Sequence, residues 1–85
     1  MGSARAGREL TRARAAYIAS VARLNAAMDA FGAADVPLDP GPNHRSVPAW
    51  TPVHVQVVTE ARDAWRQLVA TRHAYDVLRR QLRPE

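Results

Sequence analysis

The prolines of this chain constrain where helices can form. Five of its six prolines lie within sixteen consecutive residues: Pro37, Pro40, Pro42, Pro48 and Pro52. Proline lacks a backbone donor and clashes with the preceding helical turn, so it interrupts helices. Residues 1–36 and 53–83 contain no proline, and each segment can form one long helix. The sequence therefore predicts two helices joined by a long, stiff connection.

The first predicted helix covers residues 9–31, where apolar side chains recur three, four or seven positions apart. This spacing places them on one face of an α-helix. The series consists of Leu10, Tyr17, Val21, Leu24, Met28 and Phe31. Gly32 follows directly, and we expect it to end the helix because glycine readily adopts the left-handed conformation found there.

The opposite face of this helix carries a second series, made of small residues. It consists of Ala15, Ala19, Ala22, Ala26 and Ala30. Small side chains allow a close helix–helix approach, which suggests a second packing seam against another chain. Alanine is also a good helix former with no further role, and the sequence leaves both interpretations open.

The second predicted helix covers residues 52–82, with Thr51 as its N-cap and Pro52 at its first position. Apolar and small residues alternate at spacings of four and three: Val57, Ala61, Ala64, Leu68, Thr71, Tyr75, Leu78 and Leu82. Val58, Trp65 and Val69 widen this stripe. The segment VHVQVV, residues 53–58, alternates like a strand, but a lone strand would have no partner, so we predict helix.

These elements predict an all-α fold, a two-helix antiparallel hairpin that forms one domain of residues 1–85. One neighbouring helix cannot cover all the large apolar side chains, and exposed apolar patches of this kind mark interfaces. We expect a homodimer in which two hairpins make a four-helix bundle, although another protein would satisfy the same surface. The predicted interface or core residues are Leu10, Tyr17, Val21, Leu24, Met28, Phe31, Val57, Ala61, Trp65, Leu68, Tyr75, Leu78 and Leu82.

The connection, residues 32–51, is longer than most helix–helix connections, which have about 2–8 residues. It also carries apolar side chains, so we expect an ordered loop in which Leu38 and Trp50 cap the bundle. Trp50, directly before Thr51, suits a hydrophobic staple. The alternative is a partner-binding loop, because stiff proline segments dock well in aromatic grooves.

The net charge is +4, and all twelve basic residues are arginines. A hairpin brings both termini to one end, where a possible anion or nucleic-acid patch would form. Its residues are Arg5, Arg8, Arg12, Arg14, Arg72, Arg79, Arg80 and Arg83. A solvated helix end explains the same residues. Arg14 and Arg72 flank apolar stripes, and they would either pair with Glu9 or Asp76 of a second chain or bind a ligand.

No catalytic arrangement of residues is recognisable. The chain has no cysteine, and its histidines, His44, His54 and His73, are not spaced as metal ligands. Glu60 and Asp63 share one helix face, which is ordinary for a solvated helix. We therefore predict no catalytic residues, no metal and no cofactor. The expected function is a non-enzymatic, self-associating interaction module. The alternatives are a nucleic-acid-associated regulator and a small-ligand binder or enzyme with an arginine-lined dimer pocket.

The sequence contains no run of about 18 apolar residues, the length a membrane-spanning helix needs. Its first ten residues, MGSARAGREL, lack the apolar stretch of a signal peptide. We therefore expect a cytoplasmic protein without a membrane partner.

Overall fold

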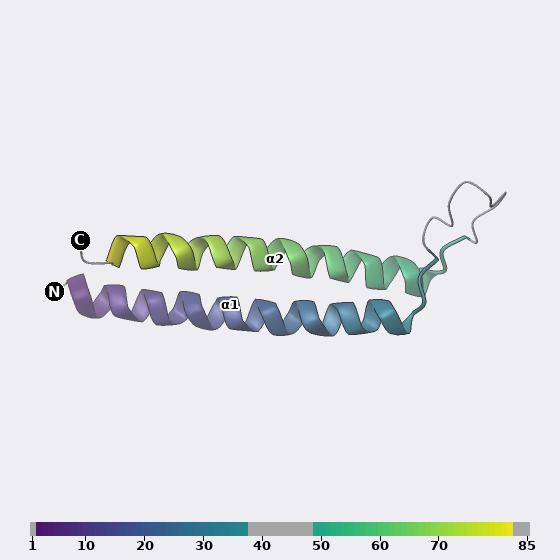
Figure 1. The fold of residues 1–85 in the computed structure, drawn as a ribbon, viewed down its shortest axis with the longest axis horizontal. Helices are drawn as coiled ribbons and strands as arrows, with labels where there is room; N and C mark the ends of the chain where they lie inside the picture. Colours follow the sequence, from purple (N-terminus) through teal and green to yellow (C-terminus); the bar gives the residue numbers. More distant parts are fainter. Residues whose placement is uncertain (1, 38–48, 83–85) are drawn as a thin grey trace.

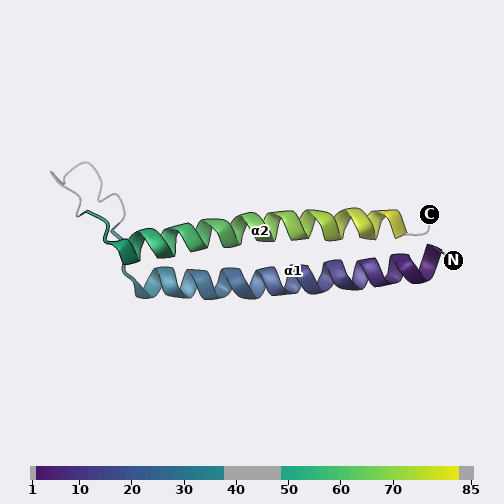
Figure 2. The same ribbon diagram turned by 180° about the vertical axis from the view of Figure 1, so that it is seen from behind.

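The computed structural model describes residues 2–37 and 49–82. These residues form two helices, α1 at Gly2–Ala33 and α2 at Pro52–Leu82, and contain no strand. The helices run antiparallel and lie side by side along their whole length (Figures 1 and 2). The beginning of α1 and the end of α2 therefore meet at one end of an all-α hairpin.

Helix α1 begins seven residues before the predicted start at residue 9. Ala6 and Leu10 are both partly buried, which shows that the packing stripe continues toward the N-terminus. This packing outweighs the low helix propensity of Gly7. Thr11 also bonds back to the first turns, because its hydroxyl donates to the Gly7 carbonyl at 2.9 Å.

The end of α1 differs from the prediction, because Gly32 lies inside the helix and does not end it. The backbone N–H of Ala34 donates to the carbonyl of Ala30 at 3.0 Å, and that of Asp35 donates to Gly32 at 3.3 Å. Asp35 has a φ of 51°, so an aspartate holds the left-handed position. Aspartate tolerates this conformation better than most residues because its short polar side chain can bond locally.

Helix α2 spans the same residues as its sequence-based prediction, and the segment 53–58 is helical. Its first turn is closed by a reciprocal pair of hydrogen bonds. The backbone N–H of Thr51 donates to His54 Nδ1 at 3.1 Å. The backbone N–H of His54 donates to the Thr51 hydroxyl at 3.3 Å. This is a capping box in which histidine takes the place of the usual glutamate, so His54 has a structural role.

The contact between the helices is a seam with alternating spacings of three and four, the repeat of a coiled coil. On α1 the partly or fully buried seam residues are Ala6, Leu10, Ala13, Tyr17, Ser20, Leu24, Ala27 and Phe31. On α2 they are His54, Val57, Ala61, Ala64, Leu68, Thr71, Tyr75 and Leu78. Every second seam residue of α1 is small, which lets the two backbones approach closely.

Contacts across the seam fix its register. The hydroxyl of Thr71 donates to that of Ser20 at 2.9 Å, and Ser20 in turn donates to the Ala16 carbonyl at 2.8 Å. Tyr17 and Tyr75 stack with their ring centroids 5.9 Å apart. Two residues that face each other across the seam therefore have residue numbers that add up to about 91, as residues 20 and 71 do.

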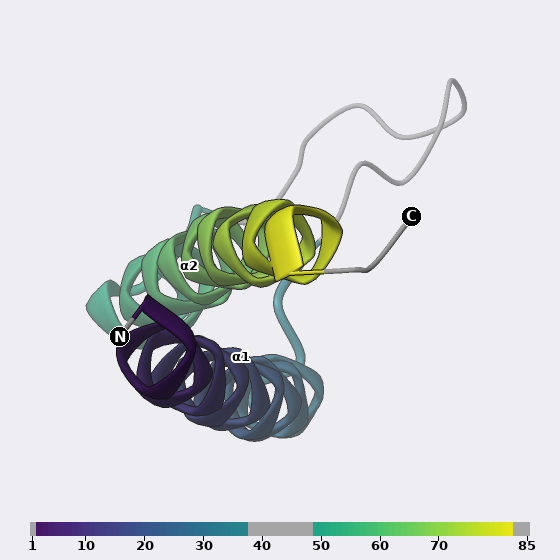
Figure 3. The ribbon, with the colours of Figure 1, turned by 90° about the vertical axis from the view of Figure 1, so that its left-hand side faces the viewer.

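The buried core of the hairpin is small. Among the described residues, the only hydrophobic side chains that count as buried are Ala27, Val36 and Ala64. Ser20 is the one buried polar residue among them, with none of its surface exposed. An end-on view shows the helix pair with both broad sides uncovered by any other described element (Figure 3). The large apolar residues are therefore only partly covered.

Candidate interaction surface

The seam separates the hairpin into two broad faces, and one of them is polar. Arg23 of α1 reaches across to α2 through three hydrogen bonds. Its Nε donates to Glu60 Oε2 at 2.9 Å, its Nη2 donates to Glu60 Oε1 at 2.6 Å, and its Nη1 donates to Gln67 Oε1. We call Arg23, Glu60 and Gln67 the polar face.

The charges on the polar face stabilise each other. The hydrogen bond from Arg23 lowers the pKa of Glu60 below its ordinary value. The same bond raises the pKa of Arg23. Their spacing alone predicts Glu60 and Asp63 on a solvated helix face. The structure instead pairs Glu60 with a residue 37 positions earlier, which only the register of the hairpin reveals.

The other broad face is apolar. Its residues are Ile18, Val21 and Met28 of α1 with Val58, Trp65 and Val69 of α2. On both helices they lie at spacings of three, four and seven on the side of the seam opposite to Arg23, Glu60 and Gln67. The side chains of Ile18, Met28, Trp65 and Val69 are 49–56% exposed. We call these six residues the open face.

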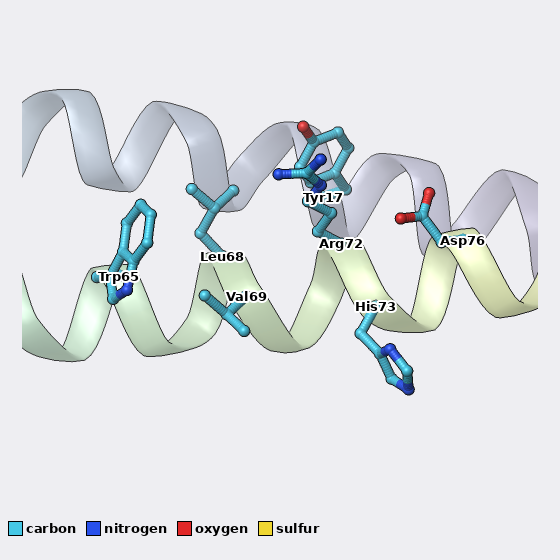
Figure 4. A pocket seen from close by; sticks show the side chains of 7 residues that line it. All are labelled: Tyr17, Trp65, Leu68, Val69, Arg72, His73 and Asp76. Carbon is cyan, nitrogen blue, oxygen red and sulfur yellow. The ribbon is translucent and has the colours of Figure 1, made fainter.

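A shallow groove of about 410 Å³ lies at this face, where α2 meets Tyr17 of α1. It is lined by Tyr17, Trp65, Leu68, Val69, Arg72, His73 and Asp76. Leu68 points between the helices, Trp65 extends from α2 toward α1, and His73 turns away (Figure 4). The groove thus combines aromatic and aliphatic walls with the guanidinium of Arg72 and the carboxylate of Asp76.

The predicted interface residues fall into two groups in the structure. Most lie in the seam between the helices: Leu10, Tyr17, Leu24, Phe31, Val57, Ala61, Leu68, Tyr75 and Leu78. Val21, Met28 and Trp65 lie on the open face, and Leu82 is 39% exposed at the end of α2. The large apolar residues did not point to Ala6, Ala13, Ser20 and Ala27, which also lie in the seam. Their seven-residue repeat was the available signal.

The small-residue stripe of α1 lies away from α2. Ala15, Ala19, Ala22, Ala26 and Ala30 are all exposed. The hairpin itself therefore does not use this stripe, and a second packing seam there stays a prediction.

The predicted loop cap lies only partly within the described residues. Trp50 is 45% exposed, and its Nε1 donates to the carbonyl of Pro37 at 2.9 Å. This bond joins the two sides of the connection where it leaves the helices. Leu38 and the rest of residues 38–48 lie outside the described part, so the capping role stays a prediction.

Charge is distributed unevenly along the hairpin. We define the terminal half as residues 2–19 and 72–82 and the loop half as residues 20–37 and 49–71. The terminal half has seven arginines, all exposed, and two acids: Arg5, Arg8, Arg12, Arg14, Arg72, Arg79, Arg80, Glu9 and Asp76. The loop half has three arginines and four acids: Arg23, Arg62, Arg66, Asp29, Asp35, Glu60 and Asp63. The terminal half is therefore strongly basic.

Two ion pairs neutralise part of this basic half. Arg5 lies 3.4 Å from Glu9, and Arg79 lies 3.9 Å from Asp76. The guanidinium of Arg79 also lies over the ring of Tyr75, 5.4 Å from its centroid. Exposed pairs of this kind contribute little to stability. Arg83 lies outside the described residues.

No metal site occurs within the described ranges, because they contain no group of three His, Cys, Asp or Glu side chains suited to hold an ion. Neither helix, over the residues described, has the length and apolarity needed to cross a membrane. No family model, curated protein or solved structure matches this chain. Its function is therefore argued from its surfaces alone.

Proposed function

We propose that this chain is a self-associating helical module in which two hairpins pair through their open faces into a four-helix bundle. The observation that carries the proposal is Trp65, the largest side chain of the open face, which is 56% exposed in the single hairpin. Large buried aromatic residues dominate the energetics of interfaces. A second copy is the simplest partner, because it brings an identical apolar surface.

The six residues of the open face extend over about 15 residues of the hairpin, roughly 22 Å at 1.5 Å per residue, and two helices side by side are about 20 Å wide. The apolar patch therefore offers on the order of 450 Å² per chain. Polar residues around it would supply the rest of the roughly 800 Å² that each partner of a standard interface buries, as in the polar rim of most interfaces. The alternation of apolar residues at helical spacing on the open face is typical of bundle interiors.

The first test is the mass in solution, measured by light scattering over a concentration series in wild type and in Val69→Asp. We expect a wild-type dimer and a monomer for the variant, because a carboxylate in an apolar interface would be buried without a partner. Val53→Asp is the matched control. Val53 is similarly exposed, at 57% against 51% for Val69, but it lies seven and fourteen residues before Glu60 and Gln67 and so shares the polar side of α2.

A wild-type monomer that stays folded at micromolar concentration would contradict the proposal. So would a dimer that Val69→Asp leaves intact while Val53→Asp dissociates it. A wild-type chain that aggregates in both low and high salt would favour a different protein as the natural partner of the open face.

A second candidate function is binding of nucleic acid by the terminal half. It is favoured by the seven exposed arginines that gather there against two acids. Binding of this kind weakens steeply with salt, because each phosphate contact releases counterions. We expect the double variant Arg79→Ala/Arg80→Ala to bind DNA or RNA more weakly and with a shallower salt dependence. The control is Arg62→Ala/Arg66→Ala in the loop half, and no binding at low salt would remove this candidate.

A further inference from the structure

We infer that the second copy docks antiparallel to the first, so that Trp65 of each chain lies in the groove beside Arg72 of the other. This inference rests on the proposed self-association and adds the orientation of the two hairpins. Its two supports are the uneven charge of the hairpin and the position of Trp65 relative to the groove.

The charge distribution disfavours a parallel dimer. Two hairpins that point the same way would place two terminal halves together, each with seven arginines and two acids. Reversing one hairpin brings each basic terminal half beside a loop half with three arginines and four acids. Opposite charges within about one Debye length attract, whereas like charges repel. Electrostatics therefore favours the antiparallel pair.

The register of the hairpin fits the same orientation. By the cross-seam contacts, Trp65 lies level with about residue 26 of α1, and Arg72 lies level with about residue 19. The most exposed open-face residues centre near the level of residue 23. A two-fold axis at that centre, perpendicular to the helices, carries Trp65 to the level of about residue 20. This is the level of the groove between Val69 and Arg72.

The groove is chemically suited to an indole. Tyr17, Leu68 and Val69 provide an apolar wall, and Arg72 provides a cation that can lie over the ring face. The two-fold axis makes this contact twice in each dimer. In the parallel arrangement, Trp65 would instead lie over the α1 helix of its partner, near the level of Asn25 and Met28.

Orientation can be measured with spin labels on single cysteines, since the chain has no cysteine of its own. Ala4 and Ala26 are exposed on α1, one near the terminal end and one near the proposed axis. In the antiparallel dimer we expect the two Ala4→Cys labels about 60 Å apart and the two Ala26→Cys labels about 15 Å apart, at 1.5 Å per residue along the helix. In a parallel dimer both distances would be about 20–30 Å.

Similar distances at the two positions would overturn the antiparallel inference but leave the proposed dimer intact. A monomer by light scattering, with no coupling between labels, would overturn both. This separates the two failures, because the oligomeric state and the orientation have different readouts.

The groove contact has its own test. We expect Arg72→Met to weaken dimerisation roughly ten- to nine-hundredfold, because the substitution removes two symmetric contacts and each cation–π contact contributes about three- to thirtyfold. Arg66→Met, an exposed arginine on the outer side of the same helix, is the matched control and should leave the dimer constant unchanged. Equal effects of the two variants would contradict the placement of Trp65 beside Arg72.

Discussion

At the scale of single residues, the small side chains of the seam determine how closely the helices pack. Ser20 has no exposed surface, and its hydroxyl is bonded on both sides, to the Ala16 carbonyl and to Thr71. A polar group can be buried at little cost when its hydrogen bonds are made. The seam therefore tolerates a serine at its centre because the serine is small and its hydrogen bonds are satisfied.

Ser20→Leu should destabilise the hairpin by about 1–3 kcal/mol, because extra side-chain atoms in a packed site force neighbouring groups apart. Ser20→Ala is the control, and it should lower the free energy of unfolding by less, since the Thr71 hydroxyl can turn its proton to the Gln67 carbonyl, which lies 3.0 Å away. Urea denaturation at fixed protein concentration measures both. A leucine variant as stable as wild type would contradict the prediction, because it would show that the helices can move apart at residue 20 without loss of stability.

The pairing of Glu60 with Arg23 predicts a pH dependence. The hydrogen bond lowers the pKa of Glu60 in the folded state, so the pair stabilises the fold above the pKa of the unfolded glutamate, about 4.3. This stabilisation is lost as the pH falls through the lower, folded-state pKa. We expect Glu60→Gln to lose less stability than wild type between pH 7 and pH 3 in urea titrations.

Asp29→Asn is the control for this pH experiment, because Asp29 is an exposed carboxylate with no ion pair described. It should follow the wild-type pH profile. If Glu60→Gln and wild type lost equal stability on acidification, the bidentate contact would not persist in solution.

The residue level was also where the sequence was hardest to interpret. Apolarity alone placed Met28 with Leu24 and Phe31, whereas the structure places Ala27 in the seam and leaves Met28 49% exposed. The position of a residue in the seven-residue repeat decides whether it faces the other helix. A small residue at a seam position is therefore buried, whereas a large apolar residue next to it stays exposed. Arg23 and Glu60 could not be paired from the sequence, because their contact depends on the alignment of two distant helices.

At the scale of elements, α2 was predicted better than α1. Thr51 and Pro52 are specific start signals, and α2 begins at Pro52 as expected. The N-terminal part of α1 has no such signal. Its helical state depends on packing of Ala6 and Leu10 against α2, which sequence propensity does not include.

The end of α1, where Asp35 rather than Gly32 takes the left-handed conformation, gives a prediction at this scale. Gly32→Ala should stabilise the protein by about 0.5–1 kcal/mol, because alanine is the better helix former. An added Cβ at residue 32 would meet nothing within 4 Å. Asp35→Ala should destabilise it, because alanine disfavours the left-handed conformation of residue 35. Thermal unfolding of both variants measures the contrast, and destabilisation by Gly32→Ala would mean that the helix ends at residue 32.

At the scale of the whole molecule, the hairpin has too small a core for its length. Two helices of 32 and 31 residues bury only Ala27 and Ala64 as hydrophobic residues, and Val36 after α1 is the one other hydrophobic residue buried within the described ranges. Most helical stability in proteins comes from tertiary packing rather than from propensity. The all-α hairpin followed from the sequence because proline placement and helical periodicity are local features. The dimer remains a proposal because its contacts lie between chains.

If the open face is closed only by a second copy, then folding and association are linked. The unfolding midpoint should then rise with protein concentration, by an amount equivalent to about 1.4 kcal/mol per mole of dimer for each tenfold increase. Val69→Asp should abolish this dependence and lower the midpoint, whereas Val53→Asp should retain it. Calorimetry or circular dichroism over two decades of concentration measures the shift. A wild-type midpoint independent of concentration would mean that the single hairpin is stable with Trp65 exposed, and the open face would then be a surface for a different partner.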